Sequence, residues 1–149
     1  MAHGRVLTMN NSVDYMRHFV DVVNCKEIRS LSFDLIIMSP PPDAFTPFRV
    51  QMVPEFLTRV TWCHIQQISL AFVISRGSHV DIFDWKSVAD ILARSNFDDL
   101  RLIRIIIHLD HGDDQMKTET FIREHAFFMF DARGILDVEF RNEIEGTYY

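Results

Sequence analysis

The chain has 149 residues, of which 48% are hydrophobic, and a formal net charge of −6. This length supports one domain with a substantial core, and 13 phenylalanines against only five glycines exclude a disordered or low-complexity chain. The 15 basic residues are scattered, which argues against nucleic acid as a partner, and no apolar run approaches the roughly 20 residues that a membrane-spanning helix needs. Residues 1–13 lack a secretory-signal pattern, so we expect an intracellular protein, cytoplasmic or nuclear.

In the first unit, about residues 12–38, apolar residues at 16, 19, 20 and 23 have helical spacing, and Ser12 can cap the helix. A strand is predicted at 28–37. The loop 39–48 that follows contains four prolines, which predicts a stiff extended connection.

In the second unit, about residues 49–75, Val53, Leu57 and Val60 form the apolar stripe of a predicted helix. Pro54 fits the first turn of that helix, where its missing N–H has no helical partner. A strand is predicted at 65–74.

In the third unit, about residues 84–109, Asp84 can cap a helix, and a strand is predicted at 100–108. The apolar side of this helix consists of Trp85, Val88, Ile91 and Leu92.

In the fourth unit, about residues 114–141, a strand is predicted at 135–140, and the tail 142–149 is expected to fray. The apolar face of the preceding helix is predicted to be Phe121, Ile122, His125 and Met129, with Asp113 or Asp114 near its start. The phenylalanines at 127, 128 and 130 are expected in the core.

One pattern recurs in all four units: an aliphatic residue, two others, a second apolar residue, one other, and a bulky apolar residue. The first positions of the copies are residues 28, 65, 100 and 135, so the steps are 37, 35 and 35 residues. A fixed period of this kind is typical of stacked repeat proteins. The copies are Ile28, Leu31 and Phe33; Ile65, Ile68 and Leu70; Leu100, Ile103 and Ile105; and Ile135, Val138 and Phe140.

Helix and strand alternate, and each interval is long enough for the helical crossover that parallel strands require. We therefore expect one α/β domain over residues 1–149. Two architectures fit this order: an open stack with strand order 1-2-3-4 and helices on one face, or a doubly wound sheet with helices on both faces.

The residues between the repeated apolar positions favour the open stack, because they point to the opposite side of each strand. There are eight such residues, two in each copy of the pattern, and seven of them are polar, which predicts a sheet face exposed to water. Arg104 and Glu139 are expected to pair across adjacent strands. The eight are Ser30, Ser32, Gln67, Ser69, Leu102, Arg104, Asp137 and Glu139.

The second half of the chain resembles the C-terminal, leucine-rich-repeat-like region of fungal F-box-type proteins of the basidiomycete kind. The resemblance covers roughly residues 84–141 and implies a module that recognises a target protein; the F-box itself is not seen. It is carried by Trp85, Ile91, Leu92, Ala93, Phe97, Leu100, Arg101, Ile103 and Ile105, then by Phe121, Ile122, Arg123 and Glu124, and by Asp131, Ala132, Arg133, Gly134, Ile135 and Leu136.

The sequence therefore predicts a non-enzymatic protein-interaction or scaffold module whose partner binds the polar face. The alternative is a small metal-dependent enzyme that uses His108, Asp110, His111 and Asp113, a cluster of nitrogen and oxygen donors in one loop. No glycine-rich phosphate loop or serine-hydrolase motif is present, and we expect no cofactor.

The first predicted strand would also leave an apolar edge exposed. Either residues 1–11 cover that edge or another chain does, so self-association or a larger parent protein is expected.

Overall fold

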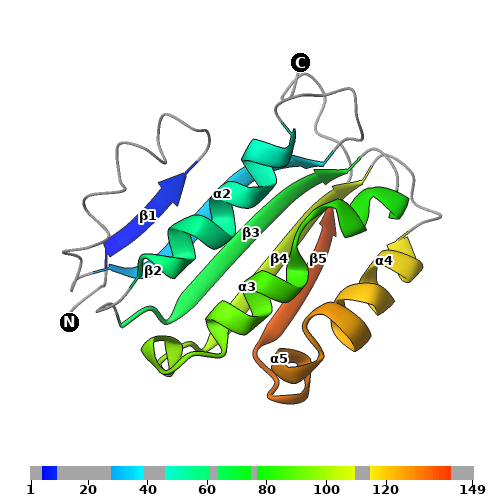
Figure 1. Cartoon of the computed structure of the whole chain (residues 1–149). Helices are drawn as coiled ribbons and strands as arrows, with labels where there is room; N and C mark the ends of the chain where they lie inside the picture. Colours follow the sequence, from blue (N-terminus) through cyan, green and yellow to red (C-terminus); the bar gives the residue numbers. More distant parts are fainter. Residues whose placement is uncertain are drawn as a thin grey trace.

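The computed structural model describes residues 5–9, 28–38, 46–60, 64–74, 77–109 and 115–141. It is an α/β fold with a five-stranded, all-parallel sheet whose strands follow chain order. Figure 1 shows the α-helices on one face of this sheet, which confirms the predicted open stack. The strands are β1 (Arg5–Met9), β2 (Ile28–Met38), β3 (Gln67–Ile74), β4 (Leu102–Leu109) and β5 (Leu136–Arg141).

Short helical elements connect the strands. Three of them are not α-helical: η1 and η2 are 3-10 turns, and η4 is a π-helical turn that joins α4 to α5. The elements are α2 (Thr46–Thr58), η1 (Gly77–Ile82), α3 (Trp85–Leu92), η2 (Ser95–Phe97), α4 (Gln115–Phe121), η4 (Ile122–Ala126) and α5 (Phe128–Ala132).

The repeated apolar positions point into one core between the sheet and the helices. Ile68 and Leu70 of β3 and Ile103 of β4 are fully buried there. In β5, at the edge of the sheet, Val138 and Phe140 are only half-buried. From β2 to β4 the period of the sequence thus corresponds to a column of aligned side chains, as the stacked-repeat interpretation requires. In β5 the register is displaced by two residues, so that Val138 lies opposite Ile105 rather than Ile103.

Side-chain contacts between neighbouring units have the same period. Arg104 contacts Glu139 and His64 contacts Asp99, each pair 35 residues apart. Asn96 donates a hydrogen bond to the carbonyl of Val60, 36 residues earlier. These contacts join equivalent parts of adjacent units, as expected when each unit packs laterally on the one before it.

The sheet has one strand more than the four predicted. Residues 5–9 form β1, which pairs in parallel with β2 and places Leu7 opposite Leu31. Of the two alternatives for the edge of the first predicted strand, the structure therefore shows that part of 1–11 covers it. This short segment lacks the repeated pattern, and the backbone groups of β2 supply the pairing that makes it a strand.

The second predicted helix begins earlier than the sequence indicated. The prediction of an extended loop over 39–48 is therefore wrong at the C-terminal end of that range, where the helix has already begun. Helix α2 starts at Thr46, so Pro54 lies inside the helix rather than in its first turn. Its missing N–H costs one helical hydrogen bond, and its carbonyl accepts one from the Thr58 hydroxyl at 2.7 Å. Burial of Val53 and Phe56 beside it offsets that loss.

Helix α3 begins as predicted. The Asp84 carboxylate accepts hydrogen bonds from the backbone N–H of Ser87 at 3.1 Å and from its hydroxyl at 2.6 Å. This arrangement satisfies one of the free N–H groups at the helix start. The predicted apolar side of the helix is buried: Trp85, Val88, Ile91 and Leu92.

The predicted apolar face of the last helix is partly wrong. His125 and Met129 are exposed, whereas Phe127 and Phe130 are buried. The cause is η4, in which the N–H of Phe127 donates to the carbonyl of Ile122, five residues earlier, at 2.8 Å. One extra residue in this turn rotates the buried stripe away from the spacing of a regular α-helix.

The predicted first helix, most of the proline-rich loop, the capping candidates Asp113 and Asp114, and the tail 142–149 lie outside the described residues. Within the described part of the chain, no helix is both long enough and apolar enough to cross a membrane.

Candidate functional site

The face of the sheet opposite the helices carries all eight side chains that the sequence assigned to partner binding. In β4, Ile103, Ile105 and Ile107 point into the core and are fully buried. Leu102 and Arg104 alternate with them and are half-buried on the other side. No helix among the described residues covers this face, which we call the helix-free face, and it contains the residue types that burial against helices would exclude.

The strand register arranges these side chains in rows across the sheet. One row runs from Thr8 of β1 through Ser32, Ser69 and Arg104 to Asp137 of β5. The preceding row contains Ser30, Gln67 and Leu102, and Glu139 lies in the following row, opposite Ile106. Residues far apart in sequence therefore form one continuous surface, which a partner can contact across several strands at once.

The charged part of this face lies on β4 and β5. The Arg104 guanidinium donates to the Glu139 carboxylate at 2.8 Å and lies 3.9 Å from the Asp137 carboxylate. Arg141 contacts the Glu139 carboxylate as well, at 3.2 Å. The predicted Arg104–Glu139 pair is confirmed, and it is diagonal, because Arg104 sits directly opposite Asp137.

These contacts also set the ionisation of the cluster. Hydrogen bonds from Arg141 and Arg104 hold the pKa of the Glu139 carboxyl below its usual value. The Arg104 side chain is 36% exposed, and salt bridges with this much contact to water contribute little to stability.

The part of the face on β2 and β3 carries mainly hydroxyl and amide groups. The Ser32 hydroxyl donates to the Asp34 carboxylate at 3.0 Å, and the Gln67 amide donates to the Ser69 hydroxyl at 3.4 Å. Serine and glutamine side chains can each both donate and accept hydrogen bonds, so this part can pair with the polar groups of a peptide.

His108 is the only member of the predicted metal-binding loop among the described residues; Asp110, His111 and Asp113 lie outside them. It occupies the helix-free face at the end of β4, between Val73 and Arg141 in register. Burial, followed by the nearby positive charge of Arg141, lowers the pKa of His108, and the carboxylates of Glu139 and Asp34 only partly oppose this. Within the described residues, no three His, Cys, Asp or Glu side chains are placed to hold a metal ion.

Replacing His108 with glutamine is expected to remove one source of acid sensitivity. Because the pKa of His108 is lower in the folded state than in the unfolded chain, the contribution of this residue to stability is fully present above about pH 6.5. It falls as the pH drops from there towards the folded-state pKa, since the unfolded chain binds the proton first. Urea unfolding at pH 7.5 and 5.5 should show a smaller loss for H108Q than for the parent; an equal loss would contradict this assignment.

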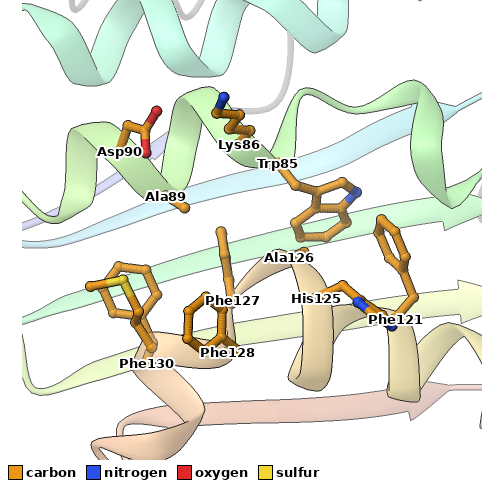
Figure 2. Close-up of a pocket in the computed structure, with 11 residues that line it drawn as sticks. Trp85, Lys86, Ala89, Asp90, Phe121, His125, Ala126, Phe127, Phe128 and Phe130 are labelled. Carbon is orange, nitrogen blue, oxygen red and sulfur yellow. The ribbon is translucent and has the colours of Figure 1, made fainter.

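A second candidate site lies on the helical layer, where sequence reasoning expected only core. A cavity of about 390 Å³ opens between α3 and the segment formed by η4 and α5 (Figure 2). Phe128, predicted in the core, is 57% exposed at this cavity, and Met129 is 52% exposed. A run of apolar residues that is too long for one α-helical stripe was the signal available in the sequence.

The comparisons with known proteins place no constraint on either site. The chain matches no family model, no curated protein and no solved structure.

Proposed function

We propose that the protein is a non-enzymatic interaction module that binds a protein partner through the helix-free face of its sheet. The observation that carries this proposal is the polar row of Ser32, Ser69, Arg104 and Asp137 on four adjacent strands, which no described helix covers. Parallel sheets are normally covered by helices on both faces, so a face with polar side chains and no described helix is a distinctive feature.

The two parts of the face support different kinds of contact. The hydroxyl and amide groups on β2 and β3 suit the backbone and neutral side chains of a partner. Arg104, Glu139 and Arg141 provide charges of both signs in a fixed arrangement, which favours orientation and selectivity over bulk affinity. The resemblance to the target-recognition region of F-box-like proteins agrees with this role but contributes no residue to the proposal.

A site-specific photocrosslinking experiment tests the proposal. A photoreactive amino acid is placed at Gln67 on the face, or at the exposed Arg94 after α3 as the control, and each protein is irradiated in extract of its native cells. We expect one adduct of constant size from position 67 and none of that size from position 94. Equal yields from both positions would contradict the proposal.

A charge reversal on the same face makes the test specific. Arg104→Glu places a third carboxylate beside Asp137 and Glu139, and loss of an interfacial charge pair typically costs 2–5 kcal/mol. We expect the adduct from position 67 to decrease about tenfold or more, whereas Arg94→Glu leaves it unchanged. An R104E protein that melts normally and crosslinks fully would exclude this face.

A further inference from the structure

The cavity on the helical layer exists because of the π-helical turn η4. Thr118 and Ile122 begin the buried stripe of this segment, which then continues at Phe127 and Phe130. The extra residue in η4 turns Phe128 and Met129 outward, beside α3. Insertions of this kind occur frequently at functional sites.

Two ion pairs bridge the turn. Arg123 contacts Glu119 in α4 at 3.0 Å and Asp131 in α5 at 2.8 Å. Burial opposes the charge of the guanidinium, but the hydrogen bonds to these two carboxylates outweigh it, and the pKa of Arg123 is raised. The turn that exposes the two apolar side chains is therefore linked by charge pairs to the helix on either side of it.

The cavity offers an aromatic surface, and the one polar atom of the Trp85 ring already has a partner. The Trp85 indole N–H donates to the carbonyl of Val80 at 2.6 Å, and its ring packs edge-on against Phe127 at 5.3 Å and Phe121 at 6.4 Å. Figure 2 shows Trp85 and Ala89 on α3, and Phe127 and Phe128 on the segment that faces it. Aromatic residues and methionine are enriched at the centres of protein interfaces.

The rim of the cavity carries one charge of each sign. Lys86 and Asp90 lie one turn apart on the exposed side of α3. Neither forms an ion pair with another side chain in the described part of the structure. A helical ligand with an acidic and a basic residue four positions apart would match both charges, since such residues also lie one turn apart.

We propose that this cavity, which we call the groove, binds an amphipathic helical segment of a partner protein. Its apolar side chains pack between Trp85 and Phe128, an acidic residue faces Lys86, and a basic residue faces Asp90. This is the helix-in-groove mode of recognition. The groove belongs to the helical layer and the polar rows to the other face of the sheet, so the two sites can be occupied together (Figure 1).

Three synthetic helical peptides test the inference, with binding followed by fluorescence anisotropy. They share one leucine- and phenylalanine-rich face and differ only at two flanking positions four residues apart, which are Glu and Lys, Glu and Glu, or Lys and Lys. The parent protein is expected to bind the Glu/Lys peptide about two- to fivefold more tightly than the other two peptides, which is the difference in affinity that single surface charge pairs allow. Failure of all three to bind at about 1 mM would overturn the proposal.

Charge reversals then show whether the peptides lie beside α3. Lys86→Glu should make the Lys/Lys peptide the tightest ligand, and Asp90→Lys should do the same for the Glu/Glu peptide. Asp98→Lys, an exposed carboxylate that does not line the groove, should leave the order unchanged. The same peptide order in the parent, K86E and D90K would overturn the proposal.

A change in the apolar wall separates this groove from other binding surfaces. Phe128→Ser alters an exposed side chain, so the fold should persist, and peptide binding should fall at least fivefold. Arg104→Glu on the sheet should not affect it. If F128S still binds the peptides, they bind elsewhere on the protein. If instead the parent protein self-associates, F128S abolishes this self-association and the peptides do not compete with it, then the occupant is a second copy of this chain.

Discussion

Replacing Ile105 with aspartate is expected to unfold the chain, whereas replacing Leu102 on the same strand with aspartate is expected to leave it folded. Ile105 is fully buried between the sheet and the helices, in the column formed by the repeated apolar positions. A carboxylate without a partner at such a site costs several kcal/mol or more, comparable to the 5–15 kcal/mol of a typical domain. Leu102 lies on the helix-free face and is only half-buried, so a charge there stays in contact with water.

Circular dichroism and thermal melting distinguish these outcomes directly. I105D should lack a cooperative melting transition at 25 °C and above, and L102D should melt within a few degrees of the parent. If both variants fold, the column of apolar side chains is not the core of the domain. If both unfold, the opposite face is sealed from water, and the proposed interaction surface is lost with it.

Replacing Phe72 with alanine is expected to cause the largest loss of stability among truncations of apolar residues in β3. Its ring is fully buried and packs against Phe83 at 5.0 Å and Trp85 at 5.1 Å. Truncation of a buried phenylalanine removes this contact and leaves a cavity, at a typical cost of 3–5 kcal/mol. For a chain of this length, the melting temperature should fall by roughly 10 °C or more.

Phe128→Ala is the matched control, since it removes the same ring from a site that is 57% exposed. Its expected cost is below about 1 kcal/mol, because exposed substitutions rarely exceed that value. Urea unfolding measures both variants on one scale. Equal losses would contradict the assignment of Phe72 to the core and of Phe128 to the surface groove.

Much of the fold was predictable because it is repeated. The last two residues of each copy of the apolar pattern lie on one side of a strand, and four copies at nearly constant spacing define parallel strands in chain order. The polar residues between them, such as Ser69 and Arg104, then had to share the opposite face. The 35-residue period and the opposite charges predicted the contact of Arg104 with Glu139, which the structure makes diagonally because Asp137 lies opposite Arg104.

The parts that were not predictable depend on tertiary context. Strand β1 has no repeat signature and is defined by the edge of β2 beside it. Pro54 reads as a helix start by its local preference, but the burial of its neighbours keeps it inside α2. The π-turn η4 adds one residue to a helix, and no residue type in the sequence marks that addition.

The helical groove was missed for the same reason. The spacing of a regular α-helix assigns Met129 to the buried stripe, and only the shift at η4 turns this side chain and Phe128 outward. The prediction of the helix-free face of the sheet depends on the alternation of side chains along each strand. No inserted residue interrupts that alternation in β3 and β4. Candidate sites on the two layers therefore differ in how far sequence alone can locate them.

The most direct test of the tandem, parallel arrangement is oxidative crosslinking of cysteine pairs in one row of the sheet, with Cys25 and Cys63 replaced by serine. Thr8, Ser32 and Ser69 occupy equivalent positions on β1, β2 and β3, and cysteine is close to them in size. Neighbouring strands lie about 4.8 Å apart and a disulfide spans less than about 7 Å between Cα atoms. The account predicts disulfides in T8C/S32C and S32C/S69C but not in T8C/S69C; a disulfide in T8C/S69C together with none in S32C/S69C would contradict it.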